Sequence, residues 1–249
     1  MIVSKIVADN DLAEPALPRR LLAVGSILHL ARTGDVIWGI GANGKKLDHP
    51  AAYRELDIRA VRGPLTRAFL QAKGYEVPET YGDPGMLVGR LWPREQAARR
   101  FRQRAVTVVP NFHDMHHAVG RSDAVNPTTD NIWETLGTIA ASDLVVGSSL
   151  HAIVVAESFG IPARLVASSV EPRFKFEDYY RGTGRPGFCP APDVDTAISW
   201  AGETPPSWDP KPLLDAFPRD LWEDTHDESG RSRPLQVMPT SDRPQSATD

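Results

Sequence analysis

Short apolar runs alternate with helical patterns over roughly the first 220 residues of the chain. The apolar runs at residues 21–24, 35–40, 58–61, 105–109, 143–146 and 163–167 are predicted strands. Helices are predicted at 65–72, 94–104, 131–141 and 150–159, where Gly or Pro marks several ends and apolar residues of 131–141 recur with the spacing of one helical face. This alternation is typical of βαβ units, and it predicts an α/β fold with two Rossmann-like lobes.

The order of the predicted elements also suggests a domain organisation. Residues 1–95 are expected to form a shortened amino-terminal Rossmann-like lobe, because only three or four strands fall within it. Residues 96–224 are expected to form the carboxy-terminal lobe. The segment 225–249 has few large apolar residues to bury, so it is predicted to be a disordered tail. Ligands in such folds bind beyond the carboxyl ends of the strands, here in a cleft between the lobes.

The composition is that of a globular protein rather than of a membrane-spanning or nucleic-acid-binding one. The 249 residues are 41% hydrophobic and 24% charged, with a net charge of −4 and no apolar run long enough to span a bilayer. The single cysteine, Cys189, excludes an intrachain disulfide and a Cys-rich zinc site. The first ten residues do not read as a secretory signal, so a cytoplasmic location is expected.

The sharpest chemical feature is the segment VVGSSLHAIVVAESFGIP at 145–162. A buried strand leads through Gly-Ser-Ser into a helix, and the free N–H groups of a helix amino terminus form an anion site. Ser148 and Ser149 are therefore candidate ligands of a phosphate, and His151 in the first turn is a candidate proton donor beside it. The alternative is that the serines are only helix caps and His151 is a packed or solvated residue.

This segment resembles the signature of the polysaccharide pyruvyl transferase family. The resemblance runs from about residue 21 to 180 and includes LLAVGSIL, DIRAVRGPLTRAFLQAKG, YGDPGMLV, VVPNFHD and EPRFKFEDYY. It implies transfer of a pyruvyl group from phosphoenolpyruvate to two hydroxyls of an exopolysaccharide sugar, with formation of a cyclic ketal and release of phosphate. It also implies a two-lobed fold similar to GT-B glycosyltransferases. The chain lacks the Asn-Phe-Gly-Asp type of opening motif usual in the family, which is consistent with a shortened first lobe.

The resemblance assigns roles to individual residues. His151 matches the motif histidine and is expected to act as general acid, and His113, in a loop after a strand, is a second catalytic candidate. Arg62 is expected to bind the phosphate or carboxylate; alternatively, it is a surface charge. Lys175 and Asp178 are expected to hold the second anion or a sugar hydroxyl, or else to form a local helical ion pair.

Several further features are weaker. Asn43, in a glycine-rich loop, is a secondary substrate-binding candidate. Asp83 is expected to close an Asx-Pro turn, and both Trp38 and Trp133 are expected in the core. The sequence HDMHH at 113–117 lacks a partner motif of metal-binding spacing, so no metal is expected, and no cofactor is expected besides phosphoenolpyruvate as donor substrate.

The expected partners are phosphoenolpyruvate and a saccharide acceptor, free or lipid-linked, and no nucleic acid. A lipid-linked acceptor would bring peripheral association with the inner membrane face. Two alternatives stay open. One is a GT-B-like glycosyltransferase that uses a nucleotide sugar, for which Glu157 is the only ribose-binding candidate. The other is a non-catalytic relative of the family that binds a saccharide.

Overall fold

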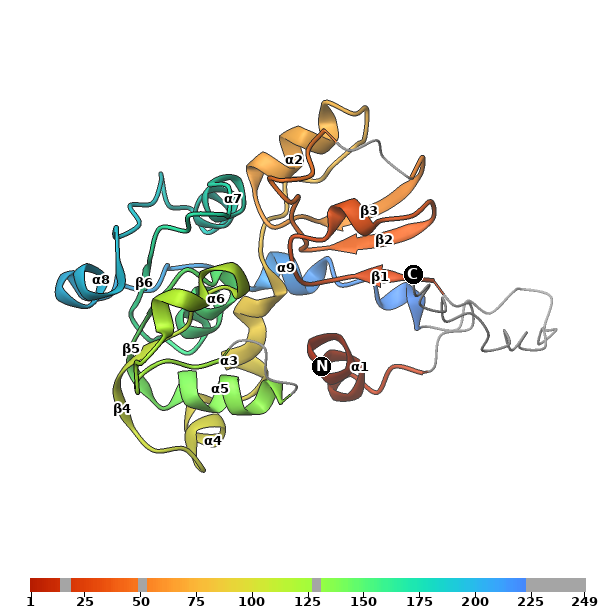
Figure 1. Cartoon of the computed structure of the whole chain (residues 1–249). Coiled ribbons are helices and arrows are strands. Elements are labelled where there is room, and N and C mark those ends of the chain that lie inside the picture. Colours follow the sequence, from red (N-terminus) through yellow and green to blue (C-terminus); the bar gives the residue numbers. More distant parts are fainter. Residues whose placement is uncertain (14–18, 49–52, 127–130, 223–249) are drawn as a thin grey trace, which may run out of the picture.

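The structure of the chain, a computed structural model, describes residues 1–13, 19–48, 53–126 and 131–222. Two separate parallel sheets of three strands each organise these residues (Figure 1). The result confirms an α/β fold with strands and helices in alternation. The predicted tail at 225–249 lies outside the described residues.

The first sheet has the order β1-β2-β3, with β1 at Leu21–Leu22, β2 at Asp35–Trp38 and β3 at Leu56–Ala60. All four residues of β2 are buried, because this central strand is covered on both faces. Val61 continues the sheet by a parallel bridge to Tyr81. The three predicted strands are therefore confirmed. Tyr81 pairs beside Val61 at the end of β3, as a single bridge and not as a further strand.

The second sheet has the order β4-β5-β6, with β4 at Arg104–Val108, β5 at Ser142–Gly147 and β6 at Ala163–Leu165. The central strand β5 leads directly into α6 at Leu150–Ser158. This helix is buried almost all round, since seven of its nine residues are shielded from solvent. It packs against β5, β6 and α5 (Ile132–Ala140) and forms the centre of the largest apolar core.

The remaining helices cover the two sheets. They are α2 (Pro64–Gln71), α3 (Val88–Leu91), α4 (Arg94–Ala98), α7 (Phe174–Gly182), α8 (Val194–Trp200) and α9 (Lys211–Asp215), with 3-10 turns that include η2 (Pro84–Leu87) and η3 (Phe112–Ala118). An amino-terminal helix, α1 (Ile2–Asp9), was not predicted, and it packs its buried Ile2 and Ile6 toward α3 and η2. Within the described part of the chain, no helix is both long and apolar enough to cross a bilayer.

The carboxy-terminal part of the described chain returns to the first sheet. The indole Nε1 of Trp38 donates a hydrogen bond of 2.8 Å to the carbonyl of Leu213 in α9, and its ring meets Phe217 edge to face at 5.1 Å. Farther along, the Arg59 guanidinium pairs with Asp220 at 2.9 Å. The first sheet is thus tied to a segment distant in sequence, and the lobe boundaries at 95 and 224 stay predictions.

Two expectations about individual segments are wrong. The helix predicted at 94–104 ends at Ala98, and Arg104 already belongs to β4. Trp38 is fully buried as predicted, whereas Trp133 is 45% exposed. The reason is that Trp133 lies in the first turn of α5, which projects beyond the core, while Leu136 and Ile139 one turn later face inward.

The close approach of the backbone at the end of β5 to the segment after β4 can be tested by substitution of a glycine. Gly147 has φ +151°, and a Cβ there would lie 2.0 Å from the carbonyl oxygen of Val109. Gly160 also has positive φ, +70°, but a Cβ there meets nothing within 4 Å. We expect Gly160→Ala to lower the free energy of unfolding by about 1–2 kcal/mol through strain alone. Gly147→Ala should cost at least about 2 kcal/mol more because of the added clash. Urea unfolding measures both, and equal losses would contradict the close approach.

Candidate active site

The region between the two sheets, where the cleft is predicted, contains a buried arginine that follows the first sheet. Arg62 follows β3, and its side chain is fully buried. Its Nε donates to Asp178 Oδ2 of α7 at 3.2 Å, one terminal nitrogen donates to Ser26 Oγ at 2.7 Å, and the other donates to the carbonyl of Ala42 at 3.4 Å. The guanidinium therefore binds the loops that follow all three strands of the first sheet and, at the same time, α7.

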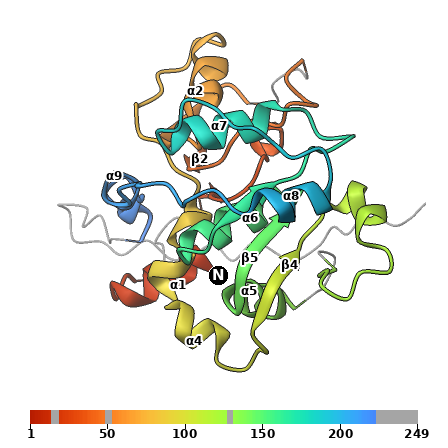
Figure 2. The same ribbon diagram turned by 90° about the vertical axis from the view of Figure 1, so that its left-hand side faces the viewer.

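Asp178 completes this connection by capping α2. Its Oδ1 accepts from the backbone N–H of Thr66 at 2.9 Å, and its Oδ2 accepts from Thr66 Oγ1 at 2.6 Å. A carboxylate at a helix amino terminus is favoured by the helix dipole. The approach is close enough to require glycine, since a Cβ on Gly63 would lie 1.8 Å from the carbonyl oxygen of Asp178. Helices α2 and α7 consequently lie side by side (Figure 2).

These contacts decide between the alternatives for Arg62, Lys175 and Asp178. Arg62 is an interior residue and not a surface charge. The local ion pair between Lys175 and Asp178 is wrong, because Lys175 Nζ instead pairs with Glu171 at 2.7 Å, one helical turn before it, and Asp178 pairs with Arg62. Whether Arg62, Lys175 and Asp178 also contact substrate stays a prediction.

A carboxylate bridges two lysines across the cleft. Glu171 Oε1 pairs with Lys45 at 2.5 Å and its Oε2 pairs with Lys175, so it joins the loop after β2 to α7. Burial alone would raise the pKa of Glu171, but the two lysines hold it below its usual value. Burial lowers the pKa of Lys175, Glu171 opposes this effect, and the positive charges of Arg62 and Lys45 add to the lowering. The cleft thus gathers cationic groups.

The glycine-rich loop after β2 forms the rim beside this bridge. Asn43 Oδ1 accepts from the backbone N–H of Lys45 at 3.0 Å, so its amide shapes the turn. A Cβ on Gly44 would lie 2.9 Å from Pro172, which shows how closely the loop approaches the segment before α7. Asn43 therefore shapes this loop, and its place at a substrate cleft and its contact with substrate remain predictions.

His151 lies in the first turn of α6 and faces a buried carboxylate of the first half. Its Nε2 lies 3.6 Å from Asp83 Oδ2, a distance of an ion pair and longer than an ordinary hydrogen bond. Asp83 is fully buried, whereas the His151 side chain is 42% exposed. Neither of these two atoms has a hydrogen-bond partner among the described residues. The imidazole can therefore reach the cleft while its Nε2 faces a carboxylate.

The charge state of Asp83 follows from its neighbours. Burial would raise the pKa of this carboxyl, but His151 and, at longer range, Arg62 outweigh burial and hold the pKa below its usual value. Its other oxygen, Oδ1, accepts from the N–H of Gly85 at 2.9 Å, which confirms the predicted turn. Asp83 is thus an anion. Its Oδ1 stabilises the turn at residues 83–85, and its Oδ2 faces the imidazole of His151.

The two serines before α6 already form hydrogen bonds within the protein. Ser148 is buried, and its Oγ accepts from the backbone N–H of Asn111 at 3.1 Å. The N–H of Ser149 donates to the carbonyl of Val109 at 3.3 Å. The first N–H with a partner inside the helix is that of Ile153. The N–H groups of the first turn of α6 remain the donors that such a terminus can offer to an anion.

Asn111 joins the loops at the carboxyl ends of the second sheet. Its amide nitrogen donates to Ser148 Oγ at 3.3 Å and to Ser168 Oγ at 3.1 Å, and its Oδ1 accepts from the N–H of His113 at 2.7 Å. His113 is exposed, and its ring meets Phe112 at 5.4 Å. The structure gives no contact between His113 and the His151–Asp83 pair. Among the described residues, no group of three His, Cys, Asp or Glu side chains could hold a metal.

The sequence pattern does not predict the contacts that Asp83, Glu171, Asn111 and Lys45 make. Asp83 and Asn111 each follow a strand or bridge and lie next to proline, which is a signal for a turn and not for a partner across the cleft. Each of them has a partner far along the chain, for example Ser148 for Asn111, 37 residues away, and Glu171 for Lys45, 126 residues away. Such pairings depend on how the two sheets are placed relative to each other.

Comparison with known proteins identifies the family of the chain. The family model of polysaccharide pyruvyl transferases matches residues 9–170. The chain belongs to the polysaccharide pyruvyl transferase family. It is similar to the succinoglycan biosynthesis protein ExoV of Rhizobium meliloti, with 29% identity over 178 residues, which cover 66% of this chain and 54% of that protein. The chain therefore spans about half the length of this relative. No solved structure matches the chain significantly.

The buried pair at the floor of the cleft predicts a stability difference between two arginines. Arg62→Ala leaves Asp178 buried without its partner, and we expect a loss of about 3–5 kcal/mol in the free energy of unfolding. Arg59→Ala removes an arginine from a more exposed cluster, with Asp57 and Asp220, and should cost about 1 kcal/mol or less. Arg62→Lys should be intermediate, since it keeps the charge and loses the planar fork.

Chemical denaturation of the three variants checks this order. An Arg62→Ala protein that is as stable as Arg59→Ala would contradict the structural role of the buried pair. If Arg62→Ala does not fold, the comparison of Arg62→Lys with Arg59→Ala still tests the order.

Proposed function

We propose that the protein transfers the pyruvyl group of phosphoenolpyruvate to a sugar of an exopolysaccharide, free or as a lipid-linked repeat unit. The observation that carries the proposal is the His151–Asp83 pair at a helix amino terminus, in a chain of this family. We also propose that the two sheets are the centres of two lobes in a GT-B-like arrangement, with the cleft between them.

The proposed reaction begins with protonation of the methylene carbon of phosphoenolpyruvate. This step gives a methyl group and an oxocarbenium-like centre. One sugar hydroxyl adds to that centre and loses its proton to a base, and the C–O bond to phosphate breaks. The second hydroxyl then closes the ketal ring and loses its own proton. The two protons lost from the diol balance the one taken by carbon and the one taken by phosphate.

In this reaction His151 acts as the proton donor. It is the titratable side chain that lies both at the amino terminus of α6 and partly open to solvent. Asp83 does not reach the cleft surface, because it is fully buried. Its role is to stabilise the imidazolium and to hold its orientation, as a carboxylate does for a catalytic histidine. The exposed His113 is the proposed second catalytic group, as base for a sugar hydroxyl.

The donor carries a phosphate and a carboxylate, so its site needs cations and N–H donors. Lys175 and Lys45 are the proposed cations at the rim, and the first turn of α6 with Ser148 and Ser149 is the proposed phosphate site. Arg62 adds positive potential from the floor of the cleft. Asn43 and Asp178 complete the proposed substrate-binding set, the latter through the position of α7.

One contact weighs against a glycosyltransferase that uses a nucleotide sugar. Glu157, the only candidate for binding a ribose, is buried. It pairs with Arg185 at 2.7 Å and accepts a hydrogen bond from the hydroxyl of Tyr179 at 2.5 Å. Its carboxylate is therefore engaged inside the core. A cytoplasmic site of action, at the inner membrane face if the acceptor is lipid-linked, is part of the proposal.

The decisive experiment measures phosphate release from phosphoenolpyruvate with a panel of saccharide acceptors. Release that depends on the acceptor, with a ketal carboxylate found on the sugar, supports the proposal. We expect His151→Ala to lower the rate by about 10²–10⁴-fold, because it removes the general acid. A folded His151→Ala protein with a rate near that of the parent would exclude this role, and the absence of release with every acceptor would contradict the proposed function.

The role of Asp83 predicts a different pattern. We expect Asp83→Asn to lower kcat by about 10–100-fold with little change in the KM for phosphoenolpyruvate, because Asp83 acts through His151. In the His151→Ala background, Asp83→Asn should cause almost no further loss in rate. Full additivity of the two losses would show that Asp83 has only a structural role.

A further inference from the structure

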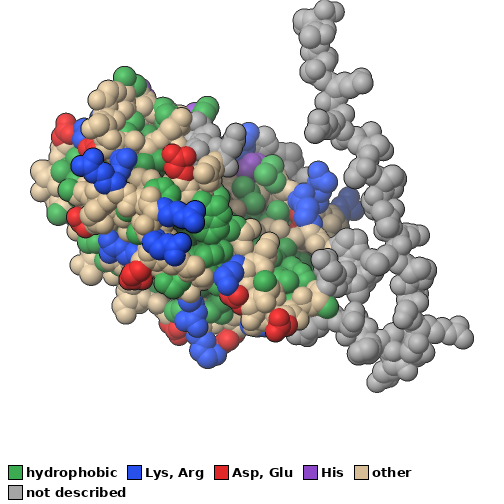
Figure 3. All heavy atoms as spheres, turned by 90° about the horizontal axis from the view of Figure 1, so that it is seen from below, with side chains coloured by type: hydrophobic (Ala, Val, Ile, Leu, Met, Phe, Trp, Pro, Cys, Tyr) green, Lys and Arg blue, Asp and Glu red, His purple; other side chains and the backbone are tan. Residues whose placement is uncertain are grey.

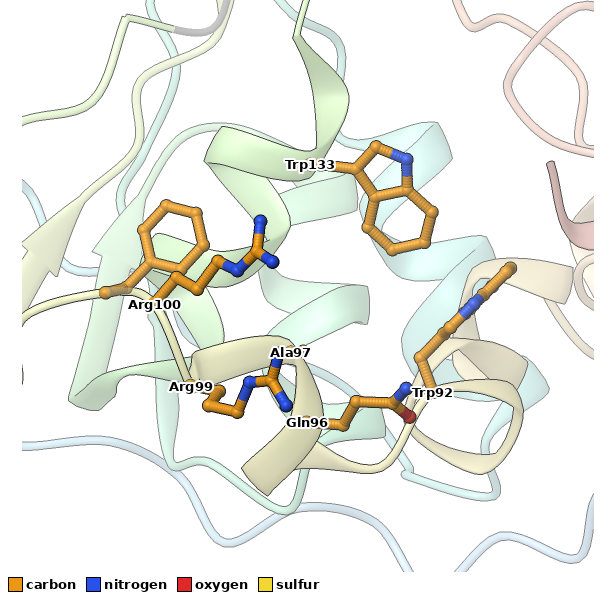
Figure 4. A pocket seen from close by; sticks show the side chains of 7 residues that line it. Trp92, Gln96, Ala97, Arg99, Arg100 and Trp133 are labelled. Carbon is orange, nitrogen blue, oxygen red and sulfur yellow. The ribbon is translucent and has the colours of Figure 1, made fainter.

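A hollow lies in the carboxy-terminal half, away from the candidate active site. It has a volume of about 310 Å³ and is lined by Trp92, Gln96, Ala97, Arg99, Arg100, Phe101 and Trp133 (Figure 4). Helix α4 precedes the amino end of β4, whereas His151 follows the carboxyl end of β5. Since β4 and β5 run parallel, the hollow and the cleft lie at opposite edges of the second sheet. The hollow therefore belongs to neither the donor site nor its rim.

The walls of this hollow are held in place by packing. The indoles of Trp92 and Trp133 meet edge to face at 5.2 Å. Phe101 packs over α5 so closely that a Cβ on Gly137 would lie 1.9 Å from its ring. The guanidinium of Arg94 donates to two backbone carbonyls at the end of α5 and the start of β5, both at 2.9 Å. These contacts fix the segment that carries Trp92 against the helix that carries Trp133.

The charge of the hollow is positive. Arg99 and Arg100 are exposed, and neither has an ion-pair partner within the part of the chain that the structure describes. None of the seven lining residues is acidic. In Figure 4 the two guanidinium groups lie opposite the indole of Trp133, with the amide of Gln96 near Trp92. The face of the molecule seen from below carries Lys and Arg side chains next to exposed apolar ones, with Asp and Glu side chains interspersed (Figure 3).

We propose that this hollow binds an acidic sugar residue of a saccharide chain. An indole offers a flat surface to the apolar face of a sugar ring, an amide bonds hydroxyls, and a guanidinium binds a carboxylate through two parallel hydrogen bonds. A concave site with polar groups on one side suits a discrete group better than the surface of a bilayer. The choice of a saccharide rests on the proposed function, whose product is itself a sugar that carries a carboxylate.

The test is a calorimetric titration of the full chain with an oligosaccharide of glucuronic acid and with a neutral glucose oligosaccharide of the same length. We expect the acidic probe to bind at least about tenfold more tightly than the neutral one. Trp133→Ala should weaken binding of the acidic probe by at least about tenfold. Arg99→Gln with Arg100→Gln should remove the difference between the two probes.

Matched controls come from the same chain. Trp200→Ala removes a tryptophan that is 47% exposed elsewhere, close to the 45% of Trp133. Arg102→Gln removes an exposed arginine of the same segment that does not line the hollow. Both controls should bind the acidic probe as the parent does. Equal binding of the two probes by the parent, or unchanged binding by Trp133→Ala, would overturn the proposal.

Two further measurements separate this inference from its alternatives. His151→Ala should bind the acidic probe as the parent does, and Trp133→Ala should release phosphate with a monosaccharide acceptor at the parent rate. Failure of phosphate release in the parent would therefore contradict the proposed function, whereas the binding titrations would still test the saccharide site. Vesicles that contain phosphatidylglycerol serve as a competing probe. Binding of these vesicles through Trp133 and Arg99, without binding of either saccharide, would identify a lipid surface as the partner instead and overturn the proposal.

Discussion

The buried ion pair between Arg62 and Asp178 is the constraint on which the cleft depends. Two charges removed from water are costly unless each is fully hydrogen-bonded. Here the guanidinium also reaches Ser26 and the carbonyl of Ala42, and the carboxylate also caps α2 through Thr66. The same contacts that satisfy the charges fasten α7 to the loops of the first sheet. The hydrogen bonds that stabilise the buried pair therefore also fix the geometry of the candidate site.

With α7 fixed in this way, groups from both halves of the chain lie at short range. Lys45 of the first half and Lys175 of the second share the carboxylate of Glu171. Asp83 of the first half faces His151 of the second at 3.6 Å. The cationic groups are paired with carboxylates of the chain itself, which lowers the cost of burying them. Among the buried carboxylate oxygens of the described residues, Asp83 Oδ2 alone has no hydrogen-bond partner, and it faces the histidine at the amino terminus of α6.

The local architecture could be predicted from the sequence with some success. The strands around residues 22, 37, 59, 107, 144 and 164 and the helices after residues 63, 131 and 149 lie where the pattern of apolar residues predicts them. The interior position of Trp38 and the turn at Asp83 were also predicted correctly. The amino-terminal helix and the exposure of Trp133 were not, because amphipathic spacing does not tell which end of a helix extends beyond the core.

The sequence by itself determined the alternation of strands and helices, the Gly-Ser-Ser turn between β5 and α6, and the family that these motifs indicate. These properties are local, since they depend on neighbours within one or two turns of chain. Only the tertiary structure decided that Arg62 binds Asp178, that Lys175 binds Glu171 and not Asp178, and that Asp83 faces His151. The pairings that cross the cleft join residues from 68 to 126 positions apart, as in Asp83 with His151 and Lys45 with Glu171. The physical reason is that such pairs form only when distant segments pack together. The burial that sets their energy depends on this packing and cannot be predicted from neighbouring residues in the sequence.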